Sequence, residues 1–485
     1  MSSFDLYTLS PLIVLCSAPV LVMLAIAVRR SHETSVAITL ASLGLAFVLV
    51  RQLGAEAPRQ ITPLIVIDRF ALFYMALIIA AAFVVAVQGY GYLKRRHVQP
   101  DEFYILLLIA TAGAAAMAAS THFASFYLGL ECLSVSLYVM IGYLRESPRS
   151  AEAGLKYLIL AAASAAFLLF GMALVYAQLG ILDFAGLAHA KATQTGSDMI
   201  VVLGFVMMLV AVGFKLSVVP FHMWTPDVYE GAPAPVTGFV ATVSKASVFA
   251  LLLRYFSAMD PHLYRPVYVA VALTAVLSML AGNLLALRQD NVKRILAYSS
   301  IAHLGYVLVA YLAGGPAAIQ AVSYYLVAYF VTTLGAFGVV GTLSTRGEHR
   351  EMDSIDDYRG LFWTRPWLAT AFTVMLLSLA GIPLTAGFIA KFSVMSAGVG
   401  ADLARLVIVL ALTSIIGLFY YLRIVAVMCA RPAQSTAPVG AYVPEEKASR
   451  SGALVLFALT VTLVWIGVFP APLIGILKTL TLGAH

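Results

Sequence analysis

Long apolar segments recur along nearly the whole chain, separated by short polar connections. A bilayer core about 30 Å thick requires about 20 apolar residues of helix, so each segment predicts a transmembrane helix. The approximate limits of the fourteen predicted spans are 11–28, 35–53, 69–92, 103–121, 122–143, 154–179, 198–229, 233–258, 266–287, 291–313, 317–343, 367–397, 402–430 and 452–478. The pattern predicts an all-α polytopic membrane protein.

Two of these spans are too long for a simple crossing. Residues 198–229 and 367–397 would each extend beyond about 45 Å as continuous helix, well above the hydrocarbon thickness. Each contains a central proline, Pro220 or Pro383, which removes a helical hydrogen bond. Free backbone groups persist at membrane depth only where they line a protein-enclosed cavity. We therefore expect two broken helices beside polar sites.

The spacing of the two breaks predicts an internal repeat. They lie five spans apart, and each is the fourth span of a five-span set. An odd number of spans inverts the second copy, as in inverted-repeat transporters. This predicts residues 1–102 as three N-terminal helices, 103–258 and 259–430 as two inverted five-helix repeats, and 431–485 as a loop with the last helix.

Composition narrows the class of protein. Of the 485 residues, 62% are hydrophobic and 11% are charged, whereas about 25% are charged in an average soluble domain. Cys16, Cys132 and Cys429 lie far apart, and no CxxC, HExxH, GxGxxG or GxxxxGK[ST] motif occurs. We therefore expect no metal site and no cofactor in this chain.

The distribution of cations predicts the orientation. Connections after odd-numbered spans carry eighteen Lys and Arg, and those after even-numbered spans carry eight. The positive-inside rule then places the odd-to-even connections in the cytoplasm and both termini outside. The net charge of +7 follows from this topology, so it gives no reason to expect nucleic-acid binding. No Lys or Arg precedes Arg29, so the first apolar segment is expected to be a permanent span rather than a cleaved signal peptide.

Ionisable residues inside the spans are the candidate site. Glu131, Lys215, Lys245 and Lys391 fall at mid-span positions, and His303 lies in the polar segment LAYSSIAHLGY. A lysine at the bilayer centre costs about 2.5–3.5 kcal/mol on insertion scales, so these residues are expected to serve a function. Lysine suits proton transfer because its pKa responds readily to burial and to a nearby carboxylate.

Each candidate has a purely structural alternative. Glu131 and Lys215 could form a static ion pair, Lys245 and Lys391 could extend to an interface, and His303 could be a hydrogen-bonded core residue. Arg423 is expected to extend toward the cytoplasmic interface, because an arginine stays charged and cannot carry protons. His222 is expected to cap or bind water at the first break. The segment PDVYEG, 226–231, is expected to be a connector.

Four segments resemble one known family, the antiporter-like membrane subunits of respiratory complex I. They are FHMWTPDVYEGAPAPVTGF, QDNVKRILAYSSIAHLGY, GIPLTAGFIAKF and SAEAGLKYLIL. The resemblance implies a proton-translocating module in which Glu131 and Lys215 form a coupled pair, Lys245 is the central relay and Lys391 is the terminal lysine. The WTPDVYEGAP segment further indicates one branch of this family rather than its paralogues.

The resemblance also implies partners. These are neighbouring membrane subunits in a row and a peripheral redox arm, where FMN and iron–sulfur clusters are expected. The location is expected to be the bacterial inner membrane. Three alternatives stay open: a subunit of an Mrp-type cation/proton antiporter, the equivalent subunit of a ferredoxin-dependent photosynthetic complex, and a scaffold that only positions its neighbours.

Overall fold

The computed structural model describes residues 3–54, 59–96, 98–187, 199–257, 265–344, 351–431 and 450–480. Four of the cations used for the orientation, Lys191, Arg346, Arg350 and Lys447, lie outside these residues. Within the described part, thirteen helices are long and apolar enough to cross a membrane. Two shorter apolar helices, α17 (Pro366–Ala380) and α18 (Ala386–Gly400), together make up the twelfth predicted span, 367–397.

The remaining elements follow in chain order. The first half contains α1 (Ser3–Thr8), α2 (Ser10–Val28), α3 (His32–Leu53), β1 (Arg59–Thr62), β2 (Ile65–Ile67), α4 (Arg69–Lys94), α5 (Asp101–Ala119), α6 (Phe123–Ile141), α7 (Pro148–Leu179), α9 (Met199–Leu216), α10 (Trp224–Gly231), α11 (Ala234–Phe239), the π-helical turn η1 (Val240–Ser244) and α12 (Lys245–Ser257). The second half contains α13 (Arg265–Leu287), α14 (Val292–Ala313), α15 (Gly315–Leu343), the 3-10 turn η3 (Ile355–Tyr358), α16 (Leu361–Thr364), α19 (Ala404–Cys429), α20 (Arg450–Val468) and α21 (Ala471–Lys478).

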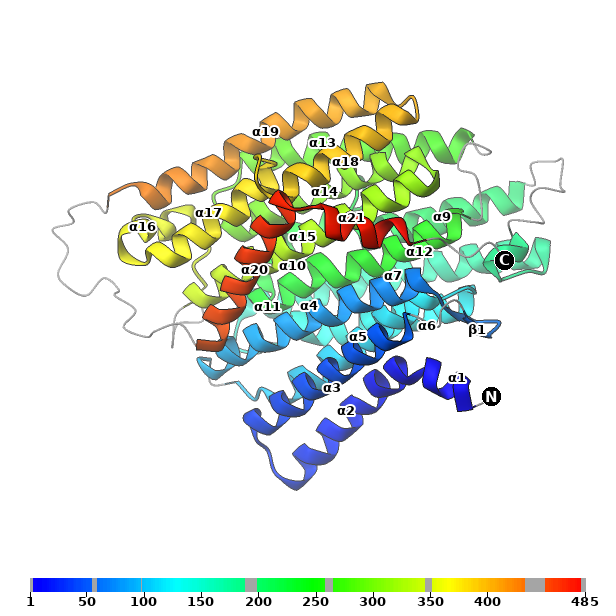
Figure 1. Cartoon of the computed structure of the whole chain (residues 1–485), viewed down its shortest axis with the longest axis horizontal. Helices are drawn as coiled ribbons and strands as arrows, with labels where there is room; N and C mark the ends of the chain where they lie inside the picture. Colours follow the sequence, from blue (N-terminus) through cyan, green and yellow to red (C-terminus); the bar gives the residue numbers. More distant parts are fainter. Residues whose placement is uncertain are drawn as a thin grey trace.

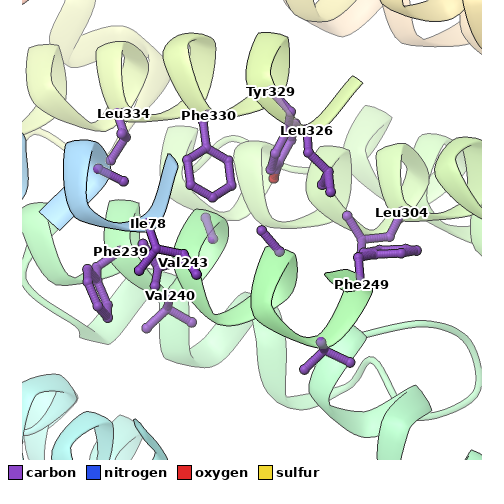
Figure 2. Close-up of a cluster of buried hydrophobic side chains, with 14 of the residues drawn as sticks. Ile78, Phe239, Val240, Val243, Phe249, Leu304, Leu326, Tyr329, Phe330 and Leu334 are labelled. Carbon is purple, nitrogen blue, oxygen red and sulfur yellow. The ribbon is translucent and has the colours of Figure 1, made fainter. Parts of the chain in front are cut away.

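The long helices lie side by side as one bundle, with α2 and α3 at one edge and α19 at the opposite edge (Figure 1). The α11–η1–α12 segment and α14 are the innermost elements, since every residue in the 18-residue apolar stretch of each is buried. Figure 2 shows apolar side chains from this region, where Phe330 and Leu334 of α15 face Val240 and Val243 of η1. The polar candidates on α12 and α14 are therefore held away from lipid.

The first predicted break is present between α9 and α10. Ser217 adopts a positive φ of 62°, which ends α9, and the residues that follow are not helical until Trp224. The freed backbone finds partners within the protein. The Trp224 indole N–H donates to the Phe214 carbonyl at 3.1 Å, and the Val219 N–H donates to Ser278 Oγ on α13 at 2.9 Å. This explains how a break persists in a membrane span.

The second predicted break is present between α17 and α18. Gly381 ends α17 with a φ of 85°, a conformation that favours glycine. Gly387 then begins α18 so close to α17 that a Cβ at this position would lie 1.8 Å from the Ser378 carbonyl oxygen. The Gly387 N–H donates to Ser378 Oγ at 3.1 Å. The flanking glycines are thus required by the geometry of the break.

Three features differ from the sequence-based expectation. The last span, expected to run through 452–478, is interrupted at Pro470 between α20 and α21. The eighth span contains the π-helical turn η1, for which no breaking residue is present. A two-stranded antiparallel hairpin, β1–β2, lies in the connection before α4. Proline accounts for the first difference, whereas the other two depend on packing.

Glycines set the closest helix pairs in corresponding parts of the two halves. A Cβ on Gly113 of α5 would lie 2.6 Å from the Gly129 carbonyl oxygen of α6, and one on Gly282 of α13 would lie 2.6 Å from the Ala302 nitrogen of α14. The first two helices of each expected five-helix set therefore pack in the same close manner. This similarity supports the predicted repeat, whose limits at 103–258 and 259–430 stay a prediction.

We predict that Gly113→Ala destabilises the protein by about 1–3 kcal/mol, because the added methyl must push α5 away from the backbone of α6. Gly44→Ala on α3 is the matched control, since a Cβ there meets nothing within 4 Å. Thermal unfolding of both variants in detergent would check this. An equal effect of the two substitutions would contradict the proposed close packing.

Candidate functional site

Three span lysines are buried, and each lies at an interruption of a helix. Lys215, Lys245 and Lys391 are 4%, 1% and 6% exposed. Lys215 occupies the last turn of α9 before the first break, and Lys245 directly follows the π-helical turn η1. Lys391 bonds to the carbonyl of Ala380, the last residue of α17. A cation is favourable at the C-terminal end of a helix, so the breaks on either side of the bundle stabilise ammonium groups.

Lys215 is bound by a hydroxyl. Its Nζ donates to Ser134 Oγ on α6 at 2.7 Å and lies 5.6 Å from the ring centre of Tyr157. Ser134 in turn donates to the Leu130 carbonyl at 2.6 Å. Glu131 lies on the same helix as Ser134, but among the described residues no ion pair within 4.0 Å joins it to Lys215.

The static ion pair, which was the structural alternative for Glu131 and Lys215, is therefore not present among the described residues. Glu131 lies three residues before Ser134 on α6, and it is the serine that accepts from Lys215 Nζ. One carboxylate oxygen of Glu131, Oε1, is buried without a hydrogen-bond partner. The carboxylate consequently acts on the lysine through the electric field rather than through a hydrogen bond.

Lys245 is bound in the centre of the bundle. Its Nζ donates to Ser300 Oγ on α14 at 2.5 Å and lies 5.5 Å from the ring centre of Tyr229 on α10. The hydroxyl of Tyr229 also lies 3.4 Å from Ser300 Oγ. This lysine does not extend to an interface, since it is enclosed by three helices.

His303 lies one helical turn beyond Ser300 on α14, between two tyrosines. Its Nδ1 is 2.6 Å from the hydroxyl of Tyr325, and its Nε2 is 3.2 Å from that of Tyr421. Tyr421 also bonds to Ser299. Sequence reasoning missed both tyrosines. Their signal was their occurrence in apolar spans, because a buried tyrosine hydroxyl usually requires a polar partner.

A small cavity lies beside His303, toward the second break. It measures about 10 Å³, roughly the room needed for one water molecule. The polar side chains that line it are His303, Tyr325, Tyr329, Thr332 and Ser378. Thr332 and Ser378 are themselves 3.1 Å apart between hydroxyl oxygens. The histidine thus faces the broken helix rather than a closed apolar core.

Lys391 lies in α18, which follows the second break. Its Nζ donates to the Ala380 carbonyl at 2.8 Å and to Ser414 Oγ on α19 at 2.6 Å, and it lies 5.4 Å from the ring centre of Tyr306. A Cβ on Gly381 would lie 2.8 Å from Lys391 Cδ. The break therefore provides both an acceptor and the space for the side chain.

The remaining candidates lie at the ends of spans or in the breaks. Pro220 and Pro383 occupy the two breaks. His222 also lies in the first break, with a buried Nδ1 that has no hydrogen-bond partner. Arg423 donates to the carbonyls of Leu287 and Gln289, so it caps the end of α13. These contacts provide no link from Arg423 to the lysines.

The segment 226–231 is tied to other helices by ion pairs. Arg294 of α14 pairs with Asp227 at 2.9 Å and with Glu230 at 2.8 Å, and Lys156 of α7 pairs with Asp227 at 2.8 Å. These contacts hold α10 between α7 and α14, as expected of a connector.

Two cations expected in surface connections are buried in ion pairs. Arg254 donates to both carboxylate oxygens of Asp68 at 2.8 Å, which joins α12 to the start of α4. Lys293 is 1% exposed and bonds to Glu351 at 2.5 Å and to the Glu230 and Ala232 carbonyls at 2.8 and 2.7 Å. The sequence analysis assigned these residues to surface connections, because an ion pair between residues distant in sequence leaves no recognisable local pattern.

The described residues contain no group of three His, Cys, Asp or Glu side chains arranged to hold a metal ion. The bundle with broken helices and buried span lysines defines an antiporter-like membrane protein. Residues 120–417 match the family model described as the NADH:quinone oxidoreductase/Mrp antiporter transmembrane region.

Curated relatives specify the branch of this family. The chain is 50% identical over 488 aligned residues to NADH-quinone oxidoreductase subunit N of Nitrosospira multiformis, covering 98% of this chain and 96% of that protein. It is 45% identical to subunit N of Ectopseudomonas mendocina, covering 99% of this chain and 97% of the relative. The chain belongs to the NADH-quinone oxidoreductase subunit N family, the branch that its WTPDVYEGAP segment indicated over the paralogous subunits L and M.

Solved structures have the same fold. A chain of respiratory complex I from Thermus thermophilus with bound aureothin is 31% identical with a TM-score of 0.80, covering 96% of this chain and 98% of that chain. A chain of the Mrp complex from Dietzia has a TM-score of 0.84 at 22% identity, covering 99% of this chain and 97% of that one. At that identity the second likeness shows the fold alone.

The Lys293–Glu351 pair generates a stability prediction. Lys293→Met leaves the buried carboxylate of Glu351 without its main counterion, and we expect a loss of about 3–5 kcal/mol. Adding Glu351→Gln removes the orphaned charge and should recover a large part of the loss. Thermal unfolding of the two single variants and the double variant in detergent checks this. Additive losses would show that the two side chains are not coupled.

Asp353, in the connection after α15, generates a pH prediction. Burial raises the pKa of its carboxyl to about 6, with Glu351 and Glu230 adding to the effect and Lys293 and Arg149 opposing it. The folded state therefore binds more protons than the unfolded state between about pH 4 and 6, so stability falls as the pH rises through this window.

Asp353→Asn should abolish this pH dependence and stabilise the protein at pH 7 by about 1–3 kcal/mol. Asp356→Asn is the control, because that side chain is 75% exposed and pairs with nearby Arg359. Unfolding temperatures measured between pH 4 and 8 provide the test. An unchanged profile for Asp353→Asn would contradict the prediction.

Proposed function

We propose that this chain translocates protons across the membrane as one subunit of an NADH:quinone oxidoreductase. In this proposal the redox chemistry takes place in partner subunits that hold FMN and iron–sulfur clusters. Family membership supports the assignment. The main observation in support of the mechanism is that the three span lysines are buried, turned away from lipid and bonded to neutral groups.

Neutral partners suit an amine that must gain and lose a proton. A lysine held by a carboxylate leaves a buried unpaired charge when it becomes neutral, which is costly. Hydroxyl groups remain satisfied in both states, because a hydroxyl accepts from an ammonium and donates to an amine. Lys215, Lys245 and Lys391 meet this condition through Ser134, Ser300 and Ser414. Lys293 does not meet it, so we assign it a structural role.

The polar groups on α14 provide the link between the central and terminal lysines. Ser300 binds Lys245, and His303 lies one turn further along with a tyrosine on each ring nitrogen. The cavity beside His303 reaches Ser378 and Ala390, which adjoin the second break and Lys391. We propose that protons pass between Lys245 and Lys391 along this path, with His303 as the relay.

Glu131 is proposed to bias Lys215 through its electric field. At an effective dielectric of about 20, a carboxylate about 4 Å away would contribute about 4 kcal/mol, and doubling the distance would halve this figure. A change in the separation of Glu131 and Lys215 would therefore favour uptake or release of a proton. Lys215 donates to Ser134 instead of forming a static ion pair with Glu131.

The proposed setting follows from the family and from the charge pattern. We propose a bacterial inner membrane location, with both termini on the periplasmic side and the cation-rich connections in the cytoplasm. Neighbouring antiporter-like and small membrane subunits and a peripheral redox arm are the proposed partners. The proposed repeats, residues 103–258 and 259–430, each contain one broken helix.

We predict that Lys215→Ala and Lys391→Ala abolish most proton pumping by the reconstituted complex, since each removes a proton-carrying group. Lys478→Ala is the matched control, because this lysine is exposed in α21. Pumping is measured as acidification of proteoliposomes alongside the rate of electron transfer. Wild-type pumping and electron transfer in both site variants would refute the proposed roles.

Purification in mild detergent separates the alternatives. A respiratory subunit is expected to arrive with flavin- and iron-containing partners and to support NADH oxidation. An Mrp-type antiporter would lack those partners, and a photosynthetic-type complex would accept electrons from ferredoxin instead. A scaffold would keep pumping when Glu131, Lys215, Lys245 and Lys391 are neutralised.

A further inference from the structure

The three span lysines share one environment that the proposed function leaves unexplained. Each Nζ donates to one serine hydroxyl, at 2.7, 2.5 and 2.6 Å, and each lies over one tyrosine ring, at 5.6, 5.5 and 5.4 Å from its centre. The pairs are Ser134 with Tyr157 for Lys215, Ser300 with Tyr229 for Lys245, and Ser414 with Tyr306 for Lys391. We refer to each pair as a Ser–Tyr cradle.

The cradles are assembled from different elements. The first uses α6 and α7, the second uses α10 and α14, and the third uses α14 and α19. All three tyrosines are at most 1% exposed. Their recurrence therefore does not follow from one local motif or from the inverted repeat alone. The common factor is the buried ammonium that each pair surrounds.

A fourth buried lysine, Lys293, can be compared with the three span lysines. Lys293 is 1% exposed, like Lys245, but it is held by Glu351 and two backbone carbonyls. Within the described part of the chain its Nζ makes no contact with a tyrosine face. The aromatic face thus accompanies the three lysines that lack a carboxylate partner and is missing at Lys293, whereas Arg254 combines the Asp68 carboxylate with the Phe70 ring at 5.0 Å.

We infer that Tyr157, Tyr229 and Tyr306 are positioning residues for proton translocation, whose ring faces stabilise the charged state of Lys215, Lys245 and Lys391. A cation within about 6 Å of a ring centre is attracted by the negative face of the ring. The ring adds no net charge, so a neutral amine leaves no orphaned ion behind. The serine hydroxyl then serves both protonation states. This inference rests on the proposed function.

Lys245 provides the sharpest test. The titratable groups next to it are Tyr229 of α10 and His303 of α14, with Tyr329 of α15 beside Tyr229 and Ser300. None of the described carboxylates lies within 4.0 Å of its Nζ. Tyr229→Leu removes the ring, whereas Tyr229→Phe keeps the ring face and removes only the hydroxyl, whose contact with Ser300 is long at 3.4 Å. The two variants therefore separate the face from the hydroxyl.

The experiment measures proton pumping by the reconstituted complex as a function of pH. Without the ring, the ammonium of Lys245 is less stable, so Tyr229→Leu should move the alkaline limit of pumping to lower pH by about one unit. Tyr229→Phe should restore the wild-type profile. If the leucine and phenylalanine variants both show the wild-type pH profile, the inference is overturned.

Matched controls exclude a general packing effect. Tyr74→Leu removes a fully buried tyrosine whose hydroxyl lies 2.9 Å from Ser323 Oγ, with no lysine over its ring among the described residues. It should lower stability without moving the pH profile. An equal pH shift in Tyr74→Leu would also overturn the inference.

Three further variants distinguish a failure of this inference from a failure of the proposed function. Lys245→Ala tests the proposed function itself, because wild-type pumping in that variant refutes the relay whatever the tyrosine variants do. Loss of pumping in Lys245→Ala together with unshifted profiles for Tyr229 variants would refute the cradle alone. If Tyr229→Leu does not assemble, Tyr157→Leu and Tyr157→Phe apply the comparison to Lys215, where a smaller shift is expected because the Phe214 ring remains at 5.9 Å.

Discussion

A backbone hydrogen bond broken inside a membrane must find another partner within the protein, and the site depends on this constraint. Each helix interruption exposes carbonyl and N–H groups that lipid cannot satisfy. At the first break Trp224 and Ser278 supply partners, and at the second break Lys391 and Ser378 do so. The interruptions therefore draw polar side chains to the centre of an otherwise apolar bundle. Lys391 occupies such a place, because the Ala380 carbonyl at the end of α17 accepts from its Nζ.

The buried cations fall into two groups with different energetics. Arg254 and Lys293 are each held by a buried carboxylate, and they join helices distant in sequence. Such pairs are costly to break, so they fix the arrangement of α4, α10, α12 and α14. The three span lysines are held by hydroxyls and ring faces, which stabilise a charge without requiring it. The bundle thus combines ion pairs that hold helices together with three span lysines that we propose change their charge.

The sequence predicted the parts of this arrangement that have a local signature. Span lengths and the two prolines located both broken helices, and the cost of a charge in lipid identified Lys215, Lys245 and Lys391. It did not predict η1, which has no breaking residue, or Ser134 as the partner of Lys215, because both depend on how neighbouring helices pack. The burial of Lys293 was missed for the same reason, since Glu351 lies 58 residues away along the chain.

The tyrosines of the Ser–Tyr cradles show that a sequence motif can identify a family without revealing what its residues contact. Tyr157, Tyr229 and Tyr306 all lie in the segments that carry the family resemblance, yet the sequence gives no reason for their presence there. The structure supplies one, because each ring lies against a lysine that has no carboxylate to neutralise it. A carboxylate at these positions would hold the proton too firmly, and an aliphatic side chain would make the ammonium too costly. An aromatic face lies between these extremes, which suits the proposed role, in which each lysine must release its proton as readily as it binds it.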